Sequence, residues 1–206
     1  MTDTLKPRVV GNVSELPTHV FGPKSLMWWG TVGFMLIEGT GFTLAGGAYF
    51  YLMGQVPHWP PGGTPPPNLL WGTLTTVVLV LSAIPNVWVD KVAHKEKLGP
   101  TRLGLVLMTL IGIVPLVLRF FELGALNVRW DLNAYGSIIW TLMLLHTLHI
   151  ATDVFDTGVL TVAVYTSHVD GRRFSDVTDN AMYWHFVWLS WLPIYVLVYW
   201  VPRWVA

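Results

Sequence analysis

The chain has 206 residues, of which 53% are hydrophobic and 12% are charged, and its formal net charge is zero. A soluble domain carries about 25% charged residues and could not bury this much apolar surface, so the composition predicts an integral membrane protein. The neutral charge balance gives no electrostatic basis for binding nucleic acid. The absence of cysteine excludes disulfides, thiolate metal sites and cysteine nucleophiles.

Five apolar segments follow a polar stretch, and prolines or charges separate them. Residues 1–25 have no apolar core of the signal-peptide kind, so we expect them to form a cytoplasmic tail. The predicted spans cover residues 26–53, 69–89, 101–126, a segment that starts near 132, and 181–201. Each is long enough, at about 20 helical residues, to cross a membrane. The predicted fold is therefore an all-α integral membrane protein, with residues 26–206 as a single domain of five transmembrane helices.

The positive charges predict an orientation. Nine of the twelve Lys and Arg residues lie in the tail, in the second connection and in the polar loop predicted at 167–180. Arg129 and Arg203 lie on the other side, and Arg119 is inside the third span. Because Lys and Arg are enriched in cytoplasmic loops, we place the N-terminus in the cytoplasm and the C-terminus outside.

Glu38 is an ionisable residue inside the first predicted span, in the stretch GFMLIEGTGFTLAGG. Such residues are costly at membrane depth and usually face the interior of the helix bundle, and the glycines nearby allow another helix to approach closely. Two interpretations stay open. Glu38 is either a proton-exchanging or lipid-contacting carboxylate, or a structural glutamate that makes one interhelical hydrogen bond.

The fourth predicted span carries polar residues at spacings of three, four and three, which place them on one helical face. They are His146, His149, Asp153 and Asp156. At about 1.5 Å per residue, a helix that starts near residue 132 reaches the cytoplasmic interface at Asp153. His185, near the start of the fifth span, has a similar depth. We therefore expect these groups and Glu38 to form one polar layer on the cytoplasmic side.

A His-x-x-His pair on one helical face can supply two ligands to a metal ion, with Asp153 as a third, or can hold a haem. The pair is a weak signal, because no other span supplies a convincing Glu-x-x-His partner. We interpret the stripe as a hydrogen-bonded seam between helices, which can also hold water or a lipid headgroup. No metal site is predicted.

Arg119 and Glu122 lie three residues apart near the outer end of the third predicted span. Residues at this spacing are neighbours on a helix surface, and the two charges are opposite. We therefore expect a structural ion pair between them.

Four segments carry a family resemblance. They are WWGTVGFMLIEGTGFTLAGGAYFY, Glu122 followed thirteen residues later by YGS, LLHTLHI, and YWHFVWLSWLPIYVLVYW. In this order they resemble subunit III of the haem-copper terminal oxidases: its helix with an embedded glutamate, its Glu and Tyr-Gly-Ser pair, its paired histidines and its closing helix. The sequence departs from the family at Trp188, where the closing motif has aspartate, and at Ile37, where serine precedes the embedded glutamate.

The resemblance implies an accessory subunit of the short five-helix form, in the inner membrane of a bacterium. It implies that the chain has no catalytic residue and no cofactor, that haem and copper belong to subunit I, and that the chain packs on subunit I in a complex with subunit II. It also implies bound phospholipid and support of proton uptake from the cytoplasm. Glu38, His146, His149 and His185 match family positions, and Asp153 is interpreted as extending the polar seam to cytoplasmic water.

Other functions compete with this interpretation. The same family resemblance fits the subunit-III-like accessory protein of a nitric oxide reductase. A free-standing proton-coupled transporter or channel is a different class, disfavoured by the lack of an internal repeat and of enough polar groups for a substrate site. An assembly or scaffold protein is a further alternative. The sequence does not distinguish oxidation of cytochrome c from oxidation of quinol.

Overall fold

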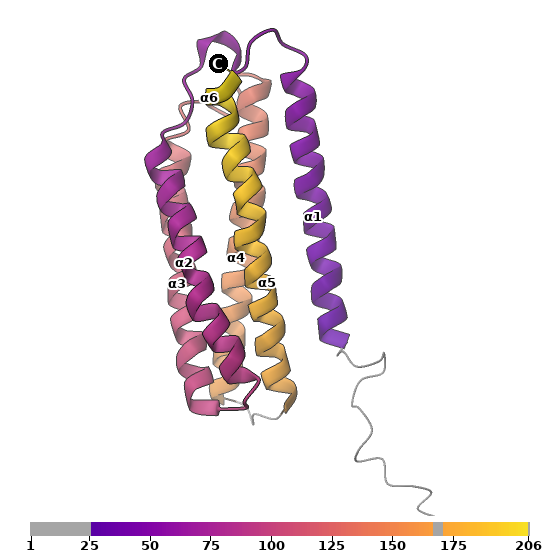
Figure 1. Cartoon of the computed structure of the whole chain (residues 1–206), viewed down its shortest axis with the longest axis vertical. Helices are drawn as coiled ribbons and strands as arrows, with labels where there is room; N and C mark the ends of the chain where they lie inside the picture. The colour runs from indigo at the N-terminus through magenta and orange to yellow at the C-terminus, as the bar shows by residue number, and fades with distance from the viewer. Residues whose placement is uncertain (1–25, 167–170, 206) are drawn as a thin grey trace, which may run out of the picture.

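The computed structural model describes residues 26–166 and 171–205, which form five long helical segments (Figure 1). They are α1 (Leu26–Met53), α2 (Leu69–Ala93), α3 (Leu98–Gly124), α4 (Ala134–Thr166) and α5 (Gly171–Tyr195). A π-helical turn, η2 (Val196–Trp200), continues α5 into the short helix α6 (Val201–Val205). The prediction of an all-α chain with five long helices is confirmed. The predicted tail at 1–25 lies outside the described residues.

Among the described residues, four helical segments are long and apolar enough to cross a membrane: α2, α3, α4 and the continuous segment Arg173–Val205. The chain is therefore a multi-pass membrane protein by length and composition. α1 has 28 residues but is not among these four. Its glycines, its aromatic residues with polar atoms and Glu38 lower its mean hydropathy.

The helices α2, α3, α4 and α5 pack in a ring, in which each contacts the next and α5 contacts α2. α1 is added to one side of this bundle, where it packs against α4 and α5 (Figure 1). Only Ala45 and Tyr49 of α1 are buried. The buried hydrophobic residues gather instead on α4 and α5, which lie between α1 and the α2–α3 pair.

The largest departure from the predicted boundaries is at the fifth helix, which begins at Gly171 and not near residue 181. Residues 171–180, predicted as part of a polar loop, are the first turns of α5, because Phe174, Val177 and Ala181 form a buried stripe at helical spacing. α4 continues past Asp153 to Thr166, because Leu160 and Val164 extend its buried face. Asp153 is an interior residue of this 33-residue helix.

The Pro/Gly-rich connection between α1 and α2 is anchored by a buried tryptophan. Trp59 is 2% exposed, and its indole Nε1 donates a hydrogen bond of 2.9 Å to the hydroxyl of Tyr49. Its ring packs edge-on against Tyr135 at the start of α4, with 5.1 Å between ring centroids. Asn68 then caps α2 by accepting a hydrogen bond from the backbone N–H of Leu70. These contacts fix where α1 and α2 meet the bundle.

Candidate functional site

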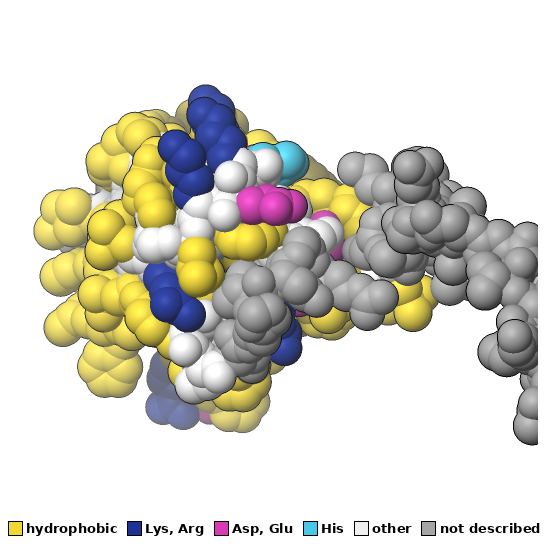
Figure 2. Space-filling model, turned by 90° about the horizontal axis from the view of Figure 1, so that it is seen from below, with side chains coloured by type: hydrophobic (Ala, Val, Ile, Leu, Met, Phe, Trp, Pro, Cys, Tyr) yellow, Lys and Arg dark blue, Asp and Glu magenta, His cyan; other side chains and the backbone are white. Residues whose placement is uncertain are grey.

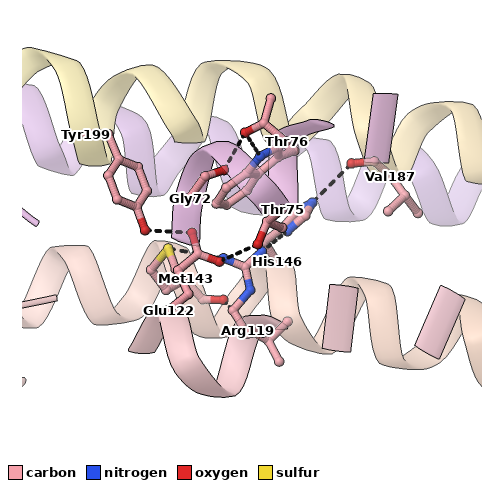
Figure 3. A network of polar contacts seen from close by, with 11 residues as sticks. Gly72, Thr75, Thr76, Arg119, Glu122, Met143, His146, Val187 and Tyr199 are labelled. Atoms are coloured by element: carbon pink, nitrogen blue, oxygen red, sulfur yellow. Dashed lines mark hydrogen bonds and ion pairs between the residues drawn. The ribbon is translucent and has the colours of Figure 1, made fainter. Parts of the chain in front are cut away.

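The polar residues inside the bundle form two clusters, which share neither a hydrogen bond nor an ion pair among the described contacts. The Arg119 cluster consists of Arg119, Glu122, His146, Tyr199 and Thr75, from α2, α3, α4 and η2 (Figure 3). The Glu38 cluster consists of Glu38, His149, Tyr183, Asp153 and Asn180, from α1, α4 and α5. Each histidine of the predicted pair belongs to a different cluster.

The centre of the Arg119 cluster is the predicted ion pair. Arg119 Nη1 lies 2.8 Å from Glu122 Oε2, and the two side chains are 1% and 0% exposed. Tyr199 donates to Glu122 Oε1 at 2.6 Å, and Thr75 donates to Oε2 at 3.1 Å. Both oxygens of the buried carboxylate are thus satisfied, as a buried charge requires.

His146 extends this cluster toward α5. Arg119 Nη2 lies 2.9 Å from His146 Nδ1, and since an arginine can only donate, Nδ1 accepts. His146 Nε2 therefore carries the hydrogen that the carbonyl of Val187 accepts at 3.0 Å (Figure 3). The ring is held neutral in one tautomer. The guanidinium of Arg119 also stacks over the ring of Trp191, 4.3 Å from its centroid.

The Arg119 cluster ties four parts of the bundle together with every oxygen of its carboxylate and both nitrogens of its histidine engaged. Arg119 Nε is the one buried polar atom of the cluster without a hydrogen-bond partner among the described residues, and the remaining bonds hold one packing arrangement. We therefore assign it a structural role. Arg119 and Glu122 do pair with each other, as their spacing predicts. The hydrogen bonds of Tyr199 and Thr75 to Glu122 were not predicted.

The Glu38 cluster joins α1 to the rest of the protein. Tyr183 on α5 donates a 2.5 Å hydrogen bond to Glu38 Oε2, and His149 Nε2 on α4 lies 3.3 Å from the same oxygen. The His149 contact is close enough for an ionic interaction but lacks hydrogen-bond geometry, so neither ring nitrogen of His149 has a hydrogen-bond partner in the described protein. His149 is 1% exposed, whereas the side chain of Glu38 is 18% exposed.

Asp153 lies on the α4 face that also carries His149, and it is fully buried. The amide Nδ2 of Asn180 is 3.5 Å from Asp153 Oδ1, 3.4 Å from Asp156 Oδ2 and 3.0 Å from Thr157 Oγ1. Asp153 Oδ2 has no hydrogen-bond partner among the described residues. Asn180 therefore links the buried Asp153 to the exposed Asp156.

The predicted polar layer is only partly assembled. The structure brings Glu38, His149 and Asp153 into one region, but it directs His146 into the Arg119 cluster. His185 lies apart from both clusters and accepts a 3.1 Å hydrogen bond from the indole of Trp188. Within residues 26–166 and 171–205, no group of three or more potential ligands is placed to hold a metal ion.

A cavity of about 480 Å³ adjoins the Glu38 cluster between the start of α1, the end of α4 and the start of α5. Tyr183 and Asn180 line it and also belong to the cluster. Its other polar lining comes from Thr31, Thr152, Asp156, Arg173, Asp176 and Asp179. Its apolar lining includes Met27, Phe34, Phe155, Val159 and Leu160. The cavity therefore has one side suited to hydrocarbon and another suited to a charged group.

Four residues of these clusters are not among the predicted site residues: Thr75, Tyr183, Tyr199 and Asn180. The two tyrosines stand at the beginning and near the end of the stretch YWHFVWLSWLPIYVLVYW. Their position beside a run of aromatic residues resembles that of interface anchors, and the sequence contains no signal that either one bonds a glutamate on a distant helix. Asn180 belongs to the polar loop predicted at 167–180, so the sequence gives no reason to place it on a helix face.

Comparison with known proteins gives consistent matches. The sequence model of the family Cytochrome c oxidase subunit III matches residues 27–204. "Cytochrome c oxidase subunit 3" of Synechocystis sp. is 25% identical over 180 residues, covering 86% of this chain and 77% of that protein. The protein of the same name from Thermostichus vulcanus is 25% identical over 175 residues, covering 84% of this chain and 87% of that protein.

A longer relative is matched in part. "Cytochrome c oxidase subunit 3" of Pisaster ochraceus is 28% identical over 147 residues, which are 69% of this chain. The same match covers 55% of the Pisaster protein, so the chain spans about half the length of that relative.

Proposed function

Because the chain belongs to the cytochrome c oxidase subunit III family, we propose that it is an accessory subunit of a haem-copper terminal oxidase, most simply one that oxidises cytochrome c. In this proposal the chain packs directly on subunit I, which carries the haems and copper, and subunit II completes the complex. The match of the family model across residues 27–204 carries the proposal. The Arg119 cluster supports it, because its ion pair and hydrogen bonds join α2, α3, α4 and η2 into one framework for docking.

We further propose that all five helices cross the inner membrane of a bacterium, with the N-terminus in the cytoplasm and one membrane domain over residues 26–206. At 28 residues α1 is about 42 Å long, enough for a hydrocarbon core of about 30 Å. Lys91, Lys95, Lys97, Arg102 and Arg173 lie at the end where α1 begins, where Lys and Arg side chains gather in Figure 2. Arg129 and Arg203 lie at the other end. This asymmetry supports the orientation.

The proposed role in proton uptake rests on the Glu38 cluster. Glu38 and His149 are in contact, Asp153 lies on the same face of α4 as His149, and Asn180 connects Asp153 to Asp156 at the wall of the cavity. Buried polar groups without a protein partner, such as His149 Nδ1 and Asp153 Oδ2, are the places where internal water binds. We propose that these groups and bound water hold protons near the uptake side of subunit I, and that phospholipid bounds the path.

Purification from the native membrane in mild detergent tests the proposal. We expect oxidase subunits I and II to be identified with the chain by mass spectrometry, together with the absorption bands of haem in a reduced-minus-oxidised spectrum. Co-purification with nitric oxide reductase subunits would leave the family assignment unchanged but would assign the chain to a nitric oxide reductase complex instead of an oxidase. A colourless protein that purifies alone, as a free-standing transporter would, contradicts the proposed function.

A further inference from the structure

We propose that the outward face of α5 docks one transmembrane helix of another subunit, and that this helix presents a side-chain hydrogen-bond acceptor to His185. The inference goes beyond the proposed function, because it assigns a face of the chain and the chemistry of the contact made there. It rests on the proposed function only in treating the chain as a subunit of a membrane complex.

His185 points away from the bundle, as the contacts of its two neighbours show. Trp184 donates a 2.8 Å hydrogen bond to Ser82 on α2, whereas the ring of Phe186 faces Phe42 on α1, with 6.5 Å between ring centroids. Successive residues of an α-helix point about 100° apart. Since one neighbour is directed to α2 and the other to α1, His185 is directed to neither. Figure 1 shows α5 in front of α4, between α2 and α1.

Residues at alternating spacings of three and four extend this face along α5. They are Met182, His185, Leu189, Leu192 and Val196. The last three are exposed, although they follow buried residues of the same helix. Alternating spacings of three and four are the pattern by which two helices pack along their length at about 20°. The outward face of α5, defined by these five residues, therefore fits a helix that lies along α5.

Trp188 fixes the hydrogen-bonding role that His185 offers to a neighbour. The indole Nε1 can only donate, and it lies 3.1 Å from His185 Nδ1, so Nδ1 accepts. The hydrogen of the neutral ring is therefore on Nε2. Among the described residues Nε2 has no hydrogen-bond partner. His185 thus presents an N–H donor on the outward face of α5.

The depth of His185 excludes water and lipid headgroups as ordinary partners. It belongs to the segment Arg173–Val205, which is long and apolar enough to cross a membrane. At 1.5 Å per residue it lies about 18 Å further along the helix than Arg173. Hydrocarbon supplies no acceptor at this depth, and an unsatisfied N–H there is costly. A hydroxyl, amide or carboxylate on a neighbouring helix would satisfy it.

A second copy of this chain does not supply the acceptor. In a symmetric dimer formed through the outward face of α5, the two copies of His185 would lie at the same depth and face each other. Each would offer an N–H, and each would already have Nδ1 occupied by Trp188. Two donors cannot bond to each other. The donor on His185 therefore favours a helix of another subunit.

The surface beside this face allows a helix to approach closely. A cavity of about 530 Å³ lies between α1 and Phe186, and Gly39, Thr40 and Thr43 are part of its lining. Both threonine hydroxyls donate to carbonyls of α1 itself, each at 2.8 Å, so they require no outside partner. Small residues of this kind are typical of helix–helix contacts in membranes. The cavity can therefore seat side chains of the docked helix.

Photo-crosslinking of the full chain in its native membrane tests the docking face. Benzoylphenylalanine replaces Leu189 or Leu192, and the control position is Leu110, which is exposed on α3. Mass spectrometry identifies the cross-linked peptides. We expect Leu189 and Leu192 to give adducts with one transmembrane segment of another protein that carries a side-chain acceptor, and Leu110 not to reach that segment. The same adduct at equal yield from all three positions, or an adduct with a second copy of this chain, overturns the proposal.

Variants of His185 test the hydrogen bond. His185→Leu should lower retention of the partner in mild detergent by about three- to tenfold, because one interhelical hydrogen bond is lost. His185→Gln should keep the partner, since its amide can accept from Trp188 and donate outward. Equal retention in His185→Leu and the unchanged chain contradicts the proposal, and thermal unfolding of the purified chains checks that both variants fold. A partner from a complex other than an oxidase would overturn the proposed function and leave the docking face assigned.

Discussion

Arg119 and Glu122 form an ion pair that is closed to solvent, with Nη1 2.8 Å from Oε2 and side chains that are 1% and 0% exposed. The pair is local in sequence, but its surroundings are not, because Thr75 and Tyr199 reach Glu122 from α2 and η2. This relationship makes the pair a sensitive probe of the whole bundle, since removing one charge leaves the other buried among groups arranged to neutralise it.

Arg119→Met is expected to lower the free energy of unfolding by about 3–5 kcal/mol, because Glu122 then lies buried without a cation. The double variant Arg119→Met with Glu122→Gln should recover a large part of this loss. Unfolding of the purified chain in a detergent titration measures both. Arg129→Gln is the control, since it breaks an ion pair with Asp131 in which the arginine side chain is 78% exposed, and about 0–1 kcal/mol is expected. Equal losses for Arg119→Met and Arg129→Gln would contradict the argument from burial.

Tyr199→Phe should destabilise the chain by about 1.5–3 kcal/mol, because it removes a 2.6 Å hydrogen bond to a buried carboxylate. Tyr195→Phe is a matched control one turn earlier. Its hydroxyl bonds to Thr73 at an exposed position, so a loss of about 0.5–1.5 kcal/mol is expected. The same detergent titration measures the loss of stability in both variants. A larger loss for Tyr195→Phe than for Tyr199→Phe would refute the prediction.

Gly136→Ala is expected to destabilise the chain by about 1–3 kcal/mol through overpacking. A Cβ atom at this position would lie 2.1 Å from the backbone carbonyl oxygen of Arg129, and backbone cannot rotate away as a side chain can. Gly41→Ala in α1 meets nothing within 4 Å, and alanine is the better helix former by about 1 kcal/mol, so that variant should not be destabilised. Thermal unfolding of the two variants side by side gives the comparison.

Glu38→Gln and Asp153→Asn are expected to slow oxygen consumption by the intact complex, or to shorten the time over which it stays active, with haem spectra unchanged. The physical reason is that both substitutions remove a proton-exchanging group and keep the shape of the side chain. His185→Gln serves as the control, since His185 contacts Trp188 and not the Glu38 cluster. Oxygen-electrode traces of the three variants measure rate and lifetime. Wild-type traces for both Glu38→Gln and Asp153→Asn would exclude the proposed proton role.

The five long helices and their approximate centres could be predicted because they follow from local properties, namely apolar segments of sufficient length between prolines and charges. The bounds of α1 were predicted without error, at residues 26–53, since a polar stretch and a proline-rich connection flank it. The start of α5 was not predicted. Its buried stripe there contains only Phe174 and Val177, and two apolar residues among many polar ones do not stand out in the sequence.

Features that depend on near neighbours in the chain can be predicted from the residues alone: the helices, the position of Glu38 within one of them, and the pairing of Arg119 with Glu122 at a spacing of three. The long-range partner of each polar group depends instead on how the helices pack. His146 and His149 share a face by spacing, yet at 3.6 residues per turn they point about 60° apart. That angle directs His146 toward Arg119 and His149 toward Glu38, because different helices lie in the two directions. Spacing along one helix fixes where a side chain points, whereas the packing of the other helices fixes what it meets.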